Sequence, residues 1–165
     1  MLTTPRRGRQ WGLAAAALLL WPGPAVAQIP SQPPGLIVLD ERPSQEGLRV
    51  LGIYGPRQDA ASPGLWRVSV WHQHGSNATV RTDTLRCSGA APMRLSQDQD
   101  RWLLRELNPG GTITPANRAD HLVWWAVCHP EQAGRDPATL AELARQLGYS
   151  GTLRETVQIL PGRSR

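Results

Sequence analysis

Residues 48–87, LRVLGIYGPRQDAASPGLWRVSVWHQHGSNATVRTDTLRC, contain the pattern that decides the fold. Within them lie three apolar or alternating runs of strand length, Leu48–Tyr54, Leu65–His72 and Thr79–Cys87. The breaks between these runs carry Pro, Gly or Asn, and such breaks are typical of turns between antiparallel strands. This stretch therefore predicts an antiparallel meander.

The same rhythm continues on both sides of this stretch. Further runs lie at Leu36–Leu39, Met93–Ser96 and Trp102–Leu107. Asp98-Gln99-Asp100 has the composition of a tight hairpin connection, and residues 108–111, Asn-Pro-Gly-Gly, form a strong stop. We expect an α+β fold that is mainly antiparallel β, with six to eight strands. The pattern leaves open whether they form an open sheet, a small sandwich or a barrel.

The remaining elements follow after residue 120. His121–Cys128 is apolar on both faces, so we interpret it as a central strand. The clearest helix spans residues 137–147, with Asp136 as its N-cap and Gly148 just beyond its end. Leu153–Ile159 alternates and predicts a closing strand. We expect this single helix to pack on one face of the sheet.

The N-terminus has the three parts of a cleavable secretion signal over residues 1–27. A cationic start precedes an apolar run, Trp11–Trp21, and the segment ends in the small residues Ala25-Val26-Ala27. There is no Cys near the cleavage point, so we expect general secretion without lipid attachment. The chain then divides into a flexible Pro-rich leader at 28–35, one domain at 36–160 and a short tail at 161–165. The expected location is the periplasm or the extracellular space.

Charge and hydropathy narrow the partner classes. The chain carries a net charge of +5, but Arg6, Arg7 and Arg9 belong to the signal, which leaves fifteen Arg against thirteen acidic residues. A net charge of +2 is too small for a nucleic-acid binder of this size. After Ala27 no apolar run approaches the roughly 18 residues that a membrane span needs. We therefore expect neither nucleic acid nor stable membrane insertion after signal cleavage.

The two cysteines, Cys87 and Cys128, predict a disulfide. An exported chain reaches an oxidising compartment, and each of these residues is the only partner available to the other. The alternative is a pair of free buried thiols. We expect the bond to reinforce a hydrophobic core in a domain large enough to have one.

Four histidines raise the possibility of a metal site. His72 and His74 are two residues apart on a predicted strand, so both side chains point to one face and can hold Zn²⁺ or Cu²⁺ together. A third ligand would have to come from His121 or His129. The alternative is that the pair is the polar end of a core-facing stripe of even-numbered residues on the same strand.

Trp71 is a candidate for an interaction surface. It shares the odd-numbered face of its strand with Arg67, apparently opposite the core. An exposed Trp can stack on a sugar ring while Arg bonds the hydroxyl groups. The alternative is ordinary packing, because a chain without Phe must fill its core with other large side chains.

Enzyme signatures are absent from the sequence. There is no nucleophile elbow, zinc-protease motif, phosphate loop or dinucleotide fingerprint. The sequence therefore favours an exported, non-catalytic binding or interaction module whose partner is an envelope protein or a glycan. A periplasmic metal-binding protein that uses His72 and His74 is the first alternative, and an envelope hydrolase with an unrecognised site is the second.

Overall fold

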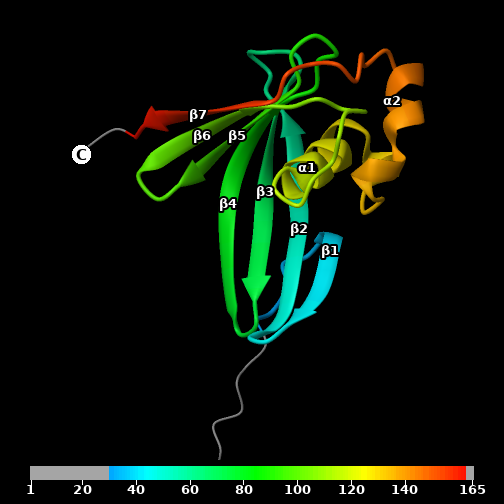
Figure 1. The fold of residues 1–165 in the computed structure, drawn as a ribbon. Coiled ribbons are helices and arrows are strands. Elements are labelled where there is room, and N and C mark those ends of the chain that lie inside the picture. Colours follow the sequence, from blue (N-terminus) through cyan, green and yellow to red (C-terminus); the bar gives the residue numbers. More distant parts are fainter. Residues whose placement is uncertain (1–29, 163–165) are drawn as a thin grey trace, which may run out of the picture.

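Seven antiparallel strands form one sheet in the computed structural model, which describes residues 30–162. The predicted signal, the first two leader residues and the last three residues of the tail lie outside the described residues. The strands are β1 (Ile37–Ser44), β2 (Gly47–Gln58), β3 (Leu65–His74), β4 (Asn77–Arg86), β5 (Met93–Asp98), β6 (Arg101–Glu106) and β7 (Thr156–Pro161). They pair in chain order from β1 to β7 (Figure 1). The predicted meander is confirmed, and the sheet is open, with β1 and β7 as its two edges.

The tight turn between β1 and β2 and the tight turn between β3 and β4 lie together at one end of this sheet. The Gly75 amide donates to the Leu48 carbonyl at 2.9 Å, which joins the β3–β4 turn to the start of β2. Gly75 has a φ of 58°, and a side chain there would collide with the Glu46 backbone. Only glycine fits this contact, because it has no Cβ and adopts positive φ without strain.

The helical segments of residues 30–162 all lie between β6 and β7. They are α1 (Arg118–Cys128), two 3₁₀ turns η1 (Pro130–Gln132) and η2 (Pro137–Thr139), and α2 (Ala141–Gln146). The interpretation of His121–Cys128 as a central strand is wrong, because these residues form most of α1. The closing strand exists, but it begins at Thr156 and not at Leu153.

The single helix predicted over 137–147 is interrupted. Asp136 caps it as expected, accepting a hydrogen bond from the Ala138 amide, but the first turn is 3₁₀ and ends at Leu140. Leu140 is 1% exposed, and its backbone, with φ −98° and ψ 6°, separates the 3₁₀ turn from α2, which begins at Ala141. The predicted stop is confirmed, since Gly148 has a φ of 87° and the amides of Gly148 and Tyr149 donate back into the last turn of α2.

The core lies between α1 and one face of the sheet, which we call the inner face. Ile53, Val68, Val70 and Leu85 are at most 1% exposed on this face. Every residue of α1 from Leu122 to Val127 is also buried, because the segment containing Leu140, Ala144 and Tyr149 covers its other side. None of the helices in residues 30–162 is long and apolar enough to span a bilayer.

Two contacts fix α1 to the end of β4. The predicted disulfide is present, with Cys87 just after β4 and Cys128 at the end of α1, and their Cα atoms are 5.3 Å apart. The Trp124 indole donates a hydrogen bond to the Arg86 carbonyl at 3.0 Å. The helix therefore crosses one half of the inner face, while β2, β3 and β4 extend beyond it (Figure 1).

Candidate functional site

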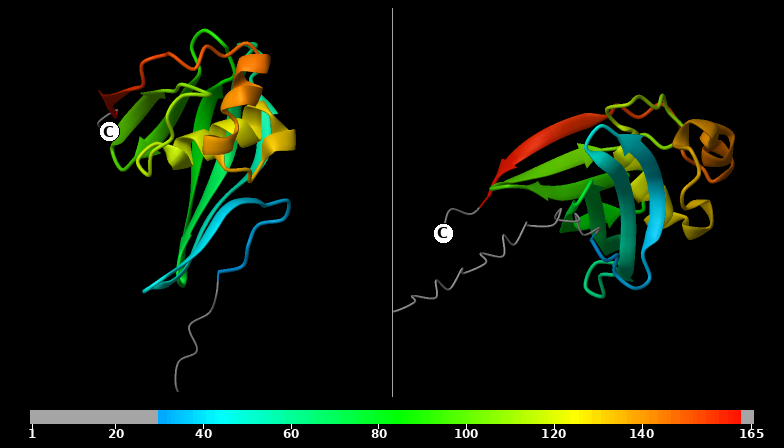
Figure 2. Two further views of the ribbon diagram at one scale, coloured as in Figure 1. Left: turned by 45° about the vertical axis from the view of Figure 1, so that its right-hand side comes forward. Right: turned by 90° about the horizontal axis from the view of Figure 1, so that it is seen from below.

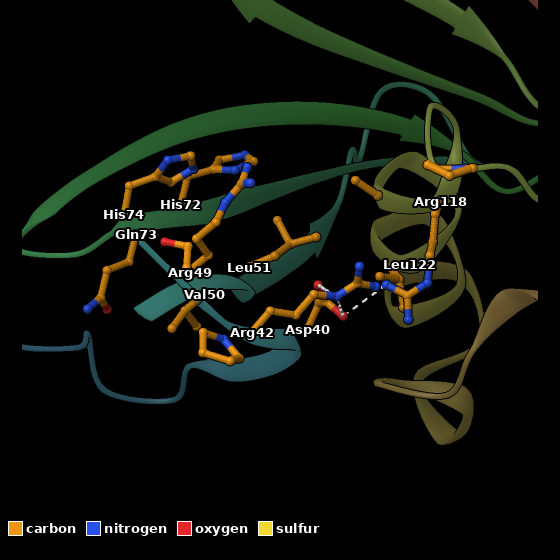
Figure 3. A pocket seen from close by; sticks show the side chains of 14 residues that line it. Asp40, Arg42, Arg49, Val50, Leu51, His72, Gln73, His74, Arg118 and Leu122 are labelled. Atoms are coloured by element: carbon orange, nitrogen blue, oxygen red, sulfur yellow. Dashed lines mark hydrogen bonds and ion pairs between the residues drawn. The ribbon is translucent and has the colours of Figure 1, made fainter. Parts of the chain in front are cut away.

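An open polar cleft lies where the inner face of the sheet extends beyond α1. It has a volume of about 360 Å³ and is lined by residues of β1, β2, β3 and the start of α1. Figure 3 shows the side chains that surround it. We call it the inner-face cleft, and its charged or titratable lining residues are Asp40, Arg42, Arg49, His72, His74 and Arg118.

Strand register explains why these side chains meet. Arg49 is directly opposite His74 on β3, and Arg42 is directly opposite Arg49 on β2. Directly paired residues project from the same face of a sheet, so the three side chains share the inner face. Arg118 is the first residue of α1, and its side chain lines the cleft from the side of the helix.

The cleft has an excess of positive charge. Among the lining residues in the described part of the chain, Asp40 is the only carboxylate, and this group binds both Arg118, at 2.9 Å, and Arg42, at 3.0 Å. Arg118 also lies 3.5 Å from Asp136. Arg49 is exposed and has no ion pair or side-chain hydrogen bond within residues 30–162, and its side chain points toward the two imidazoles (Figure 3).

His72 is neutral at physiological pH. Burial, and then the nearby Arg94 guanidinium, lower the pKa of His72 from its ordinary 6.5 to about 4. Its imidazole therefore offers one hydrogen-bond donor and one acceptor to the cleft and contributes no charge. His74, which is exposed, is the outermost residue of the strand on the same face.

Arg94 itself belongs to a buried ionic cluster that the sequence analysis missed. It binds Asp83 of β4 at 2.6 Å and Asp120 of α1 at 2.9 Å, and Asp120 also binds Arg105 of β6 at 3.2 Å. Asp83 is fully buried and Arg94 is 5% exposed. The sequence contained one signal for this cluster. Asp83 is two residues from the core residue Leu85 on the same strand, so both side chains lie on the face toward the core. The cluster fixes the start of α1 against three strands, and so it positions Arg118 at the cleft.

The structure does not bring a third histidine to His72 and His74. His121 is completely buried, and its Nε2 lies 2.7 Å from a Glu155 carboxylate oxygen. His129 Nε2 lies 2.8 Å from the Tyr149 hydroxyl. Both histidines therefore have polar partners other than His72 and His74, and the metal site expected from the sequence stays a prediction. Within residues 30–162 no three His, Cys, Asp or Glu side chains form a group suited to a metal ion.

For Trp71 the structure agrees with the alternative from the sequence, which is ordinary packing. Trp71 does project from the face opposite the core, but it is only 7% exposed. Leu36 packs over Gly52, which is directly opposite Trp71 on β2, so the segment before β1 covers this part of the sheet. Arg67, on the same face, is exposed and pairs with Asp59 at 3.3 Å.

Comparison with known proteins identifies no relative of this chain. No protein-family model, curated protein or solved structure matches the chain. The function therefore has to be argued from the geometry of the cleft.

Proposed function

We propose that the protein is an exported, non-catalytic binding module that holds a small anionic group in the inner-face cleft. The observation that carries the proposal is the Arg49 guanidinium, which faces an open cleft without a carboxylate partner in the described part of the chain. Guanidinium groups bind carboxylate and phosphate through two parallel hydrogen bonds. The ligand class is therefore a carboxylate or phosphate group.

The neighbours of Arg49 support an anion in the same place. Asp40 offsets only part of the charge of Arg42 and Arg118, so the cleft keeps an attractive potential for anions. His72 adds a neutral hydrogen-bonding group at the floor of the cleft. Carboxylate and phosphate groups occur on both expected partner classes, envelope proteins and glycans.

The main alternative is a divalent metal ion held by His72 and His74. The neutral imidazole of His72 favours it, because a histidine ligand must be deprotonated. The nearby guanidinium groups of Arg49, Arg81 and Arg94 oppose it, because they repel a cation. The charge balance of the cleft therefore favours the anion.

Titration of the mature chain with inorganic phosphate and with succinate at low ionic strength tests the proposal. Amide NMR should show saturable shifts at Arg49, His72 and His74. Arg49→Gln should weaken binding about tenfold or more, because hydrogen bonds to charged groups contribute about 1.5–3 kcal/mol. Arg57→Gln is the matched control, since Arg57 is an exposed arginine of the same strand outside the cleft.

Zn²⁺ titration of the same samples separates the two candidates. Saturable zinc binding that is lost in His74→Asn, with no response to phosphate or succinate, would replace the anion proposal with the metal-binding one. Equal weakening by Arg49→Gln and Arg57→Gln would show that anion binding is a general charge effect and would also contradict the proposal.

A further inference from the structure

The edge strand β7 is unusually apolar and uncovered. Val157 and Ile159 are 62% and 60% exposed on the inner face, and Leu160 is 40% exposed on the opposite face. Within residues 30–162, β6 is the only element that contacts β7. The views in Figure 1 and Figure 2 agree that β7 lies at the end of the sheet away from both α1 and α2. In the described part of the chain, the strand therefore has an open edge, an exposed apolar inner face and one exposed apolar residue, Leu160, on its opposite face.

The other edge of the same sheet is protected. The sequence of β1 includes Asp40, Glu41, Arg42 and Pro43, and a bulge interrupts its pairing between Val38 and Asp40. Charges, proline and bulges are the features that stop edge strands from pairing with other chains. By contrast, β7 reads TVQILP and has no charged residue, with proline only at its last position. The difference between the two edges indicates that pairing is prevented at β1 and permitted at β7.

We propose that β7 pairs with β7 of a second copy of this chain, so that two sheets join edge to edge around a two-fold axis. The five residues before Pro161 all carry a backbone N–H, and alternate residues among them direct their N–H and C=O groups toward the free edge, away from β6. Gln158 is the centre of this segment. Antiparallel pairing centred on Gln158 places Val157 opposite Ile159 of the second copy, and places Ile159 opposite Val157 of the second copy. Two equivalent apolar pairs form on the inner face, which is the arrangement that stabilises adjacent strands.

Charge and continuity favour a second copy as the occupant. In this register Thr156 is opposite Leu160 of the second copy, and no two like charges face each other along the paired segment. Leu103 lies directly opposite Ile159 on β6, and Trp102 lies opposite Leu160. On the inner face, Leu103, Ile159 and Val157 of one copy therefore form one continuous apolar patch with the same three residues of the second copy. On the opposite face Leu160 lies beside a threonine. This surface is separate from the inner-face cleft and leaves it open.

Sedimentation equilibrium of the mature chain over a range of concentrations tests the proposal. The wild-type chain should form a dimer. Val157→Lys should raise the dissociation constant at least tenfold, because two lysines would face the apolar interface. Val80→Lys is the matched control, since Val80 is 47% exposed on the interior strand β4, and it should leave the dimer unchanged.

A cysteine variant tests the register. Gln158→Cys should form a disulfide between two copies under mild oxidation, because directly opposed strand residues have Cα atoms within disulfide range. Gln97→Cys, at an exposed glutamine of the interior strand β5, should not. A wild-type chain that stays monomeric at every concentration, or a dimer unaffected by Val157→Lys, would overturn the proposal. A dimer that Val157→Lys disrupts but Gln158→Cys does not cross-link would overturn the register centred on Gln158.

Discussion

His72 shows how one residue connects the core to the cleft. It occupies the position on β3 where the inner face changes from the buried Val70 to the exposed His74. The guanidinium of Arg94, which two carboxylates hold in the core, lies near enough to oppose its protonation. Burial is the main reason that the pKa of His72 is low, and in the ionic cluster that fixes α1 the charge of Arg94 lowers this pKa further while the charge of Asp83 raises it.

We predict that His72 makes the stability of the protein depend on pH. The pKa of His72 is about 4 in the folded protein, whereas its ordinary value is 6.5. At a pH between these two values, the unfolded chain therefore binds a proton that the folded chain does not. The free energy of unfolding should therefore fall as the pH is lowered from about 6.5 to about 4, by up to about 3 kcal/mol from this residue.

Urea denaturation at several pH values measures this effect. His72→Gln should remove most of the His72 contribution to the slope. His74→Gln, at an exposed position of the same strand, should change that contribution much less, because the charge of His74 makes the smallest contribution to the low pKa of His72. His129 contributes in the same direction, because burial lowers its pKa, so some slope should remain. An identical pH dependence in wild type and His72→Gln would contradict the prediction.

At the scale of elements, α1 organises the domain. It is covered by the sheet on one side and by the segment from η2 to Tyr149 on the other, where the Trp124 and Tyr149 rings meet edge to face at 5.2 Å. Three kinds of contact hold it: the disulfide at its end, the indole hydrogen bond to β4 and the ionic cluster at its start. The position of Arg118, and with it one wall of the cleft, depends on all three.

We predict that removing the disulfide weakens the attachment of α1 to β4. The bond joins residues 41 positions apart, and a closed loop of that size stabilises a fold by about 4 kcal/mol in the chain-entropy model. The Cys87→Ser, Cys128→Ser double variant should therefore lose about 2–4 kcal/mol in chemical denaturation. Hydrogen exchange should increase most at α1 and the end of β4. A double variant within 0.5 kcal/mol of wild type, an order-of-magnitude threshold for a neutral surface change, would contradict the prediction.

At the scale of the whole molecule, we predict that the chain is exported and cleaved after Ala27. The apolar run Trp11–Trp21 is too short to anchor the protein, and Ala25-Val26-Ala27 supplies the small residues that signal peptidase requires. Intact mass of the protein from the culture medium or periplasm should correspond to a chain that starts at Gln28. A mass that retains residues 1–27 would contradict cleavage, and a protein found only in the cytoplasm would contradict export.

The sequence by itself determined the features that depend on local pattern. Alternation and turn residues were enough for the antiparallel meander in chain order, since each strand pairs with its neighbour in sequence. Two cysteines in one predicted exported chain were enough for the disulfide. The shared face of His72 and His74 followed from the two-residue period of a strand.

Only the tertiary structure decided what depends on burial from several sides. Because α1 is covered all round, its apolar residues show no helical period, and a sequence of this kind cannot be told from a buried strand. The burial of Trp71 could not be predicted, because a segment distant from β3 in sequence covers its face. The cleft combines residues of β1, β2, β3 and α1, and its charge depends on which arginines Asp40 reaches. Such pairings join residues as far apart as Asp40 and Arg118, so no local pattern in the sequence records them.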